Sequence, residues 1–489
     1  MFHKIDLLTH YGNTANNAYY NLLTLAEARD FSGRQRIFEF GLKHAISAPA
    51  WEELEFEVPS LEWIDSPQWS DFPGAETFNS VREPWARSQG RGRLASLLAR
   101  LKQSKFPFER IYGFFFSGIA TRLRRSIIES LPAGAKAGLE RLSRLVIMPI
   151  WLLSLRPFES DTTSREMAIV YGGNFLGSSR IPRRRSFKLI AFEHGTFRWS
   201  LSKSSGIFEM VWKFLYRRNI RRCDFAFVSN LDSETIDAAS RLMGNRWAAV
   251  PHPYISHSGS PYSGNSKNRA ELQMSTDSDH LILLGSSHNW SSLHDKGTFL
   301  ALEAFRNLRA RGHRVGLVTI EWGLQTDESR TFLAENQLDP HVHWLRPLPR
   351  KNLQKLAADC DLSWNQFAYR AIGAFDLRML EQGVPHVSMA PDEVGASLIG
   401  AHAPWYDAIE ASEIVTQTER ILRQYNQRSR NEILDEHAEL YRAWLSRYHS
   451  PEVLMQIQAI VFERLSVGHS WEDGKARATW AQVTAKLGD

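Results

Sequence analysis

Between residues 281 and 389 the spacing of apolar positions alternates between two periods. Wholly or mostly apolar runs, at Leu281–Leu284 and Val315–Ile320, are typical of strands that are buried on both faces. From about Thr298 the apolar residues instead recur every three or four positions, which predicts a helix. Strands that alternate with helices of about a dozen residues form parallel, doubly wound sheets, so this stretch predicts an α/β domain.

The same alternation continues to the end of this stretch. The expected elements, in chain order, are a helix near Glu328–Glu335, a strand Val342–Leu345, a helix over 348–360, a strand Leu362–Trp364, a helix after Gly373 and a strand within 384–389. We therefore predict that residues 280–445 form one Rossmann-like domain. In such sheets ligands bind outside the carboxyl ends of the strands, so the loops that follow the strands are the candidate binding site.

Residues 1–255 predict a second Rossmann-like domain. Its strands are expected at Ile5–Thr9, Met167–Tyr171, Phe187–Phe192, 224–230 and 247–254, and the Trp- and Glu-rich stretch 46–69 is expected to be irregular. The first strand runs into a turn that holds Gly12, Asn13, Asn16 and Asn17. Glycine permits close backbone approach there, and the amides supply donors and acceptors. The turn is either a capped helix start or a ligand-binding loop, and the number of asparagines favours a ligand.

Residues 91–155 differ in character and read as an insertion into the first domain. Basic residues far outnumber acidic ones, and apolar residues recur among them at helical spacing. Basic amphipathic helices suit an anionic membrane surface. A solvated basic face on helices packed against the domain explains the pattern equally well. No nucleic-acid recognition motif accompanies the charge, so we expect no nucleic-acid partner.

The junctions between these parts are also visible in the sequence. Residues 256–279 are rich in Ser, Asn, Gly and Asp and predict a flexible interdomain linker. Helices are expected over 446–489, and we predict that they return to the first domain.

The composition indicates in which cellular compartment the protein is expected. The two cysteines, Cys223 and Cys360, lie in apolar or helical contexts, so buried thiols in a reducing compartment are expected. The amino terminus has no apolar signal core, and no uninterrupted apolar stretch reaches the roughly 18 residues that a spanning helix needs. We expect a cytoplasmic protein that can also lie peripherally on the cytoplasmic face of the membrane.

The residues that follow the strands of the later domain occur in a specific order. They are Lys296-Gly297, Glu321-Trp322-Gly323, Asn365-Gln366-Phe367, Gly373 and Gly383-Val384-Pro385. This set resembles the donor-binding domain of retaining GT-B glycosyltransferases of the family 4-like, group 1 type. The resemblance implies an α/β fold of two Rossmann-like domains that face a cleft. It also implies transfer of a sugar from a nucleotide diphosphate sugar to a glycan or lipid-linked acceptor, in the synthesis of cell-surface polysaccharides or glycoconjugates.

The resemblance implies roles for individual residues. His194 and Glu193, in the segment EHGTFR after a strand of the first domain, and Lys296 are expected to be catalytic. Asn13, Asn16 and Asn17 are expected to contact the acceptor. The residues expected to bind the donor are Gly12, Ser287, His288, Lys296, Glu321, Trp322, Gly323, Gln366, Phe367, Arg370, Gly373 and Arg378. No metal or other cofactor is expected, because the relevant loops contain no Asp-x-Asp motif.

Two departures from the family pattern leave the function open. Ser286 and Ser287 stand where the family has an arginine, and Arg370 and Arg378 stand where it has two glutamates. Arginine only donates hydrogen bonds, so it cannot replace glutamate directly, but it can clamp a phosphate. Arg378 can also pair with Glu381 one helical turn on. The alternatives are a non-catalytic GT-B-like binding or scaffold protein with a degenerate donor site, and a sugar-nucleotide epimerase, which the loop order disfavours.

Overall fold

The computed structural model describes most of the chain from residue 188 onward and four earlier strands. The described ranges are 188–193, 196–202, 207–252, 266–290, 295–323, 325–346, 348, 350–368, 370–468, 471 and 479–487, together with β1 (Lys4–Thr9), β2 (Arg34–Glu39), β3 (Leu61–Asp65) and β4 (Met167–Tyr171). The expected basic insertion at 91–155 lies outside them.

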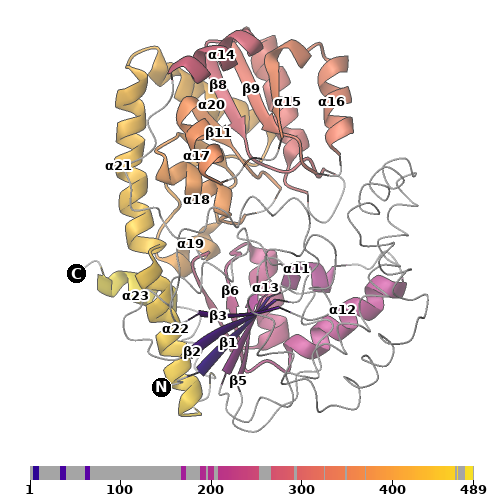
Figure 1. Ribbon diagram of the computed structural model, residues 1–489, viewed down its shortest axis with the longest axis vertical. Coiled ribbons are helices and arrows are strands. Elements are labelled where there is room, and N and C mark those ends of the chain that lie inside the picture. The colour runs from indigo at the N-terminus through magenta and orange to yellow at the C-terminus, as the bar shows by residue number, and fades with distance from the viewer. Residues whose placement is uncertain are drawn as a thin grey trace.

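The first domain is built on a seven-stranded parallel sheet with the strand order β3-β2-β1-β4-β5-β6-β7 (Figure 1). Its later strands are β5 (Lys188–Glu193), β6 (Phe225–Val228) and β7 (Trp247–Ala249). The expectation that residues 46–69 are irregular is wrong for Leu61–Asp65, since β3 pairs with β2 along its whole length. The helices α11 (Thr196–Leu201) and α12 (Ile207–Ile220) connect β5 to β6, and α13 (Ser233–Met243) connects β6 to β7.

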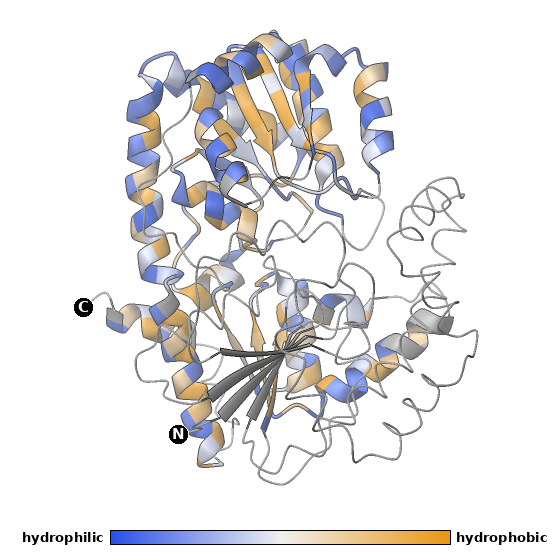
Figure 2. Cartoon of the chain, in the orientation of Figure 1, coloured by the Kyte–Doolittle hydropathy of each residue, from blue (hydrophilic) through white to orange (hydrophobic). Residues whose placement is uncertain are grey.

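The second domain is built on a six-stranded parallel sheet with the order β10-β9-β8-β11-β12-β13. The strands are β8 (His280–Leu284), β9 (Val315–Ile320), β10 (Val342–Leu345), β11 (Leu362–Trp364), β12 (His386–Ser388) and β13 (Tyr406–Asp407). Along β8, Ile282 and Leu284 enter one buried cluster, and Leu281 and Leu283 enter another. The strand is therefore covered on both faces, which explains its continuous apolar run. Figure 2 shows these strands as hydrophobic and the outer helix surfaces as mixed.

Helices cover both faces of this sheet. They are α14 (Ser266–Thr276), α15 (Thr298–Ala310), α16 (Thr326–Glu335), the short 3₁₀ helix η4 (Asp339–His341), α17 (Arg350–Asp359), α18 (Ala374–Glu381) and α20 (Ala411–Tyr425). The short α19 (Glu393–Ile399) instead packs against the first domain, where a Cβ on Gly395 would lie 2.7 Å from the Leu231 carbonyl oxygen. The prediction of a flexible linker over 256–279 is wrong for Ser266–Thr276. These residues form α14, which packs on β8, β9 and β10, and Leu272 from this helix is buried against the sheet.

Three further helices close the chain: α21 (Arg430–Tyr448), α22 (Pro451–Ser466) and α23 (Thr479–Leu487). Figure 1 shows α21 running beside the second domain toward the first, where α22 and α23 lie. Phe462 of α22 contacts Phe227 of β6, with ring centroids 6.3 Å apart, and Trp471 lies 4.5 Å from Phe225. The end of the chain thus belongs to the core of the first domain. None of the helices in the described part of the chain has the length and apolar character that a bilayer crossing requires.

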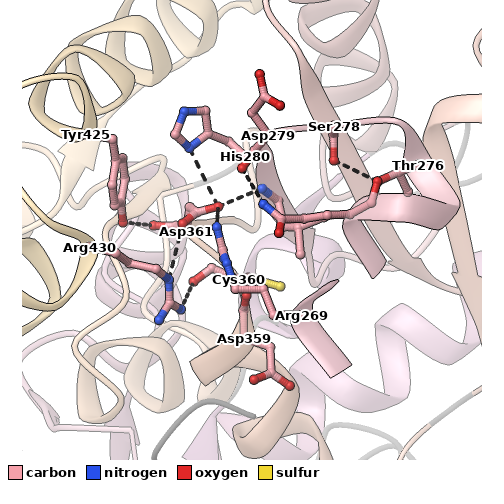
Figure 3. A network of polar contacts seen from close by, with 12 residues as sticks. Arg269, Thr276, Ser278, Asp279, His280, Asp359, Cys360, Asp361, Tyr425 and Arg430 are labelled. Atoms are coloured by element: carbon pink, nitrogen blue, oxygen red, sulfur yellow. Dashed lines mark hydrogen bonds and ion pairs between the residues drawn. The ribbon is translucent and has the colours of Figure 1, made fainter. Parts of the chain in front are cut away.

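A buried carboxylate at the amino end of β11 ties three segments together (Figure 3). The Asp361 side chain is 1% exposed and accepts hydrogen bonds from Arg269 of α14 (2.8 Å), from Arg430 at the start of α21 (3.2 Å) and from the backbone N–H of Leu281 (2.8 Å). Tyr425 of α20 donates to the Asp361 carbonyl (2.6 Å). The helix that follows the first crossing between the domains, α14, and the helix that leads back to the first domain, α21, are therefore both anchored at Asp361.

We expect Asp361→Ala to lower the free energy of unfolding by about 3–5 kcal/mol, because it leaves two partly buried arginines without their counter-charge. Burial alone would raise the pKa of this carboxyl, but His280, 3.7 Å away, and the hydrogen bond and charge of Arg269 outweigh it and hold the pKa below its usual value. A depressed folded pKa means that the stabilisation is present above the unfolded pKa of about 3.9 and is lost as the pH falls through the folded pKa. Urea unfolding at several pH values measures both effects.

Asp279→Ala is the matched control. Asp279 is 62% exposed and lies 3.3 Å from Arg314, a surface ion pair that contributes at most about 1 kcal/mol. Equal losses in the two variants, or an Asp361 effect that does not shrink in acid, would contradict the anchoring role.

Candidate functional site

The candidate site lies where the strand order of the second sheet reverses, between β8 and β11. Loops leave this point in opposite directions, which makes a crevice in which doubly wound proteins bind ligands. The loop after β8 holds Ser287 and His288, and the loop after β11 holds Gln366 and Phe367. The structure therefore brings the donor residues predicted for these two segments onto adjacent loops.

The Lys296-Gly297 turn packs directly against the loop that follows β11. The backbone N–H of Phe367 donates to the Lys296 carbonyl (2.8 Å), and the N–H of Lys296 donates to the Asn289 carbonyl (3.1 Å). Gly297 has φ +72°, and a Cβ there would lie 2.8 Å from backbone atoms of Phe367 and Ala368. Glycine is needed for this approach, which places Lys296 beside the residues after β11.

The ammonium group of Lys296 lies in a mixed electrostatic environment. Its Nζ donates to Oε1 of Gln366 (3.2 Å), and Gln366 in turn donates to the carbonyl of Ala371. Burial lowers the pKa of Lys296 to about 8; the negative charge of Asp376 opposes this change, and the positive charge of Arg198 in the first domain adds to it. A partly desolvated cation is thus held at the switch point, within electrostatic reach of a second cation on the other domain.

The loop after β8 uses hydroxyl groups where the family has an arginine. Ser286 and Thr298 share a hydrogen bond (3.0 Å), and Thr298 also donates to the carbonyl of Ser287 (2.7 Å). Ser287 accepts from the side chain of Asn289 (3.0 Å) and is 8% exposed. The loop is therefore closed by its own polar groups and presents no cation from these positions.

His288 is a core residue. Its ring is fully buried, with Nδ1 2.9 Å from the hydroxyl of Ser329 and Nε2 3.1 Å from that of Thr319. Burial, together with the charge of Arg330, lowers its pKa to about 4. The prediction that its side chain binds the donor does not fit this position, because both ring nitrogens are engaged inside the domain. Its backbone N–H and carbonyl are engaged as well, by Trp322 and Gln325.

The Glu321-Trp322-Gly323 turn after β9 packs against the backbone of His288. The N–H of His288 donates to the carbonyl of Trp322 (2.8 Å), and a Cβ on Gly323, whose φ is +124°, would lie 2.5 Å from the His288 carbonyl oxygen. The Glu321 carboxylate pairs with Arg330. Trp322 is 48% exposed, so this turn presents a large aromatic surface beside the loop after β8.

The two arginines at the expected glutamate positions have different surroundings. Arg370 precedes α18 in a loop, donates to the carbonyl of Ala390 (2.7 Å) and lies 3.4 Å from a carboxylate oxygen of Asp407. Arg378 lies within α18, and its Nε is buried without a hydrogen-bond partner. Arg378 and Glu381, both described, form no ion pair. Arg370 is thus held toward β12 and β13, while Arg378 retains unused donor capacity.

Two other predicted donor residues, Phe367 and Gly373, have structural roles. Phe367 is 1% exposed and packs in the core of the second domain. Gly373 is the N-cap of α18, and its N–H donates to the carboxylate of Asp376 (2.6 Å). Phe367 therefore contributes through its backbone contact with Lys296, because its ring is out of reach of a ligand.

Glu193 anchors the segment EHGTFR. The carboxylate is 2% exposed; one oxygen accepts from the N–H of Phe197 (2.9 Å) and the other from the hydroxyl of Tyr216 (2.9 Å). Burial, together with the charge of Glu193, raises the pKa of Tyr216 well above its usual value. This carboxylate is committed to holding α11, which carries Arg198, so a catalytic role does not fit it. The predicted site residues outside the described ranges are His194, Gly12, Asn13, Asn16 and Asn17.

Sequence reasoning missed Asp376, His386 and the electrostatic role of Arg198. The available signal for Asp376 was local: it lies three residues after the helix-capping Gly373, where a carboxylate accepts from the cap N–H. His386 belongs to no motif, and Arg198 closes the segment EHGTFR, in which nothing local points to Lys296. No three His, Cys, Asp or Glu side chains among the described residues are grouped so that they could hold a metal ion.

Comparison with solved structures identifies the fold. Sucrose-phosphate synthase from Thermosynechococcus elongatus is 12% identical over 95% of this chain and 99% of its own, with a TM-score of 0.56. HepE from Anabaena, solved with UDP and glucose, is 13% identical over 95% of this chain and 100% of its own, with a TM-score of 0.52. S. aureus TarM is 12% identical over 65% of this chain, with a TM-score of 0.46; the chain spans 59% of TarM.

The chain therefore has the GT-B fold of glycosyltransferases, and the predicted architecture of two Rossmann-like domains is confirmed. A scan of the sequence against models of protein families found no match. A search of curated proteins found no significant match either.

We expect Gly297→Ala to destabilise the protein more than Gly312→Ala. Both glycines have left-handed backbones, with φ +72° and +84°, so both substitutions cost about 1–2 kcal/mol of backbone strain. Only at Gly297 does the new methyl group meet backbone atoms, whereas nothing lies within 4 Å at Gly312. Overpacking should add about 1–3 kcal/mol. Urea unfolding compares the variants, and equal losses would show that the turn can move away from Phe367.

Proposed function

We propose that the protein transfers a sugar from a nucleotide diphosphate sugar to a glycan or lipid-linked acceptor. The observation that carries this proposal is the partly desolvated Lys296 at the switch point of a GT-B domain, bonded to Gln366 and within electrostatic reach of Arg198. A diphosphate that leaves the sugar accumulates negative charge, and fixed cations in a partly dry site stabilise that charge better than water does. We assign the diphosphate to Lys296.

The neighbouring groups suit the rest of a donor. The exposed face of Trp322 offers a stacking surface for a nucleobase. Arg378 has donor capacity for a phosphate or ribose oxygen. We further propose that His194 lies beside the transferred sugar, that the anomeric configuration is retained and that no metal is needed. The carboxylates of Glu193 and Glu321 are engaged by Tyr216 and Arg330, so neither suits the nucleophile of a double displacement.

A non-catalytic binding protein on the same fold is the second candidate. The position of Arg370 favours it, because this residue replaces a family glutamate and is engaged by Ala390 and Asp407 instead of standing ready for a ligand. Such a protein would bind a nucleotide or glycan without turnover. The two functions differ in a product assay, since only the enzyme releases nucleoside diphosphate in the presence of acceptor.

We expect nucleoside diphosphates to raise the unfolding temperature of the parent and not of Lys296→Ala. A ligand at 100 times its dissociation constant stabilises by about 2.7 kcal/mol, so a panel of UDP, GDP, ADP and their sugars should reveal the base. Transfer by Lys296→Ala should slow by the equivalent of about 2–4 kcal/mol of barrier. Arg378→Ala should weaken binding of the diphosphate more than of the nucleoside. Lys355→Ala, which alters an exposed lysine of α17, is the control.

If the parent responds to no nucleotide, or Lys296→Ala responds like the parent, the donor site is misplaced. Nucleotide binding without release of product in any acceptor mixture would favour the non-catalytic candidate.

We also propose that the first domain lies against an anionic membrane surface, on the cytoplasmic side. Within the described residues, α12 supports this proposal. Met210 and Phe214 are 51% and 58% exposed, and Arg218 follows them at i+4 spacing on the same face of α12. Arg221 and Arg222 are exposed just after the helix ends at Ile220. Apolar side chains beside arginines suit the headgroup region of anionic lipids. The basic segment 91–155, which precedes α12 in the chain, would extend the contact.

Liposome sedimentation tests this surface. Binding to vesicles that contain phosphatidylglycerol should weaken with salt, because each arginine near the surface contributes roughly 1 kcal/mol. Replacing Met210 and Phe214 with Ser should reduce binding, whereas replacing the exposed Met274 of α14 with Ser should not. Equal binding to neutral vesicles, or no binding, would refute the proposal.

A further inference from the structure

A buried polar network lies directly beneath the candidate site. Asp376 of α18 is fully buried, and one of its oxygens accepts from the side chain of Asn365 (2.5 Å) and lies 2.8 Å from Nε2 of His386. The other oxygen accepts from the N–H of Gly373 (2.6 Å). On the far side of the imidazole, Nδ1 lies 2.8 Å from the hydroxyl of Ser363. The family resemblance assigns no role to these groups.

The network holds both ends of one loop. Asn365 begins the segment that follows β11, and Gly373 ends it at the start of α18. A single carboxylate bonds to both residues, so it fixes the span between them. That span carries Gln366, the hydrogen-bond partner of the Lys296 ammonium group. Displacement of Asp376 would therefore move the group that orients Lys296.

Asp376 also acts on Lys296 electrostatically. Two charged groups act on the ammonium group: Asp376 from α18 and Arg198 from α11 of the first domain. The carboxylate of the neighbouring Asp295 accepts from the N–H of Gly297 (2.7 Å). Burial and Arg198 favour neutral lysine, whereas Asp376 favours the cation. Ser363, His386 and Asp376 are all fully buried, so none of them can touch a substrate.

We propose that Asp376 is a positioning residue, whose buried carboxylate fixes the loop from Asn365 to Gly373 and keeps Lys296 cationic so that it can bind the phosphate groups of a nucleotide. This inference rests on the proposed function for its ligand. The electrostatic part concerns only the protein and is open to test without any substrate. Asp376 thus supplies, from inside the domain, the negative charge that a buried lysine needs.

The first experiment measures the charge of Lys296 directly. Acetylation of the protein at a series of pH values, followed by mass spectrometry of the peptide that contains Lys296, gives the midpoint of its titration. In the parent the midpoint should lie near 8, and in Asp376→Asn it should move to lower pH. Asn has nearly the shape of Asp but no charge. A parent midpoint below 7, or an unchanged midpoint in the variant, would overturn the proposal.

Asp361→Asn is the matched control. It also removes a buried carboxylate from the second domain, but at the amino end of β11, the opposite end of the strand from Asn365. It should destabilise the fold and leave the Lys296 midpoint where it is in the parent. A shift of similar size in this control would assign the effect to general loosening and would count against Asp376.

The second experiment links the charge to the ligand. Binding of UDP, or of whichever nucleoside diphosphate stabilises the parent, is measured from pH 6 to pH 8. Asp376→Asn should bind somewhat more weakly than the parent at pH 6, because it loses one of the two acceptor oxygens that hold the loop. At pH 8, where its lysine has lost the proton, the difference should grow about three- to tenfold. Asn365→Ala loosens the loop but keeps the carboxylate, so it should weaken binding by the same factor at every pH.

The outcomes separate the two proposals. A shifted Lys296 midpoint without any nucleotide binding would defeat the proposed function and leave the role of Asp376 in place. Nucleotide binding whose loss in Asp376→Asn does not depend on pH would leave the function in place and defeat the counter-charge role. If Asp376→Asn does not fold, the parent midpoint alone decides, since a lysine that is neutral at pH 7 is incompatible with the proposal.

Discussion

The structure depends on the buried carboxylate of Asp361 at the amino edge of the second sheet. Arg269 comes from α14, the first described helix after the chain leaves the first domain, and Arg430 comes from α21, which leads back to it. Both crossings therefore start from a fixed point on β11.

At the carboxyl end of β11 a second buried carboxylate has a different task. Asp361 is surrounded by arginines and hydrogen-bond donors that favour its own ionised form, whereas Asp376 faces an imidazole, an amide and a backbone N–H. Its charge reaches Lys296, which burial and Arg198 push toward the neutral form. One end of the sheet thus uses a buried charge to hold helices, and the other end uses it to set the electrostatics of a site.

Several residues that look chemical in the sequence turn out to be structural. Glu193 bonds to Phe197 and Tyr216, and His288 is fixed between Ser329 and Thr319. Both lie at the ends of strands, where polar residues are expected to face a ligand. The Glu193 side chain points into the first domain and holds α11, which carries Arg198. The His288 ring is held inside the second domain, and its backbone N–H bonds to the turn that carries Trp322. The same position at a strand end can therefore serve the site through the backbone alone.

The sequence by itself determined the elements and the class of the fold. Mostly apolar runs predicted β8, β9 and β11 to within a residue, because a strand covered on both faces is apolar at most positions. Gly297 and Gly323 were identifiable because turns of this kind need glycine. The polar composition of residues 266–276 led to the wrong prediction of a linker, since packing on the sheet stabilises α14 despite its polar sequence.

Only the tertiary structure decided which charges meet. Arg198 and Lys296 are about a hundred residues apart in the chain, and nothing in either segment shows that the charge of Arg198 acts on Lys296. Asp376 bonds to Gly373 through local geometry, but its contacts with Asn365 and His386 exist because β11 and β12 are neighbours in the sheet. Side-chain direction, burial and electrostatic coupling depend on the packing of distant segments, and the pattern of one segment carries no information about them.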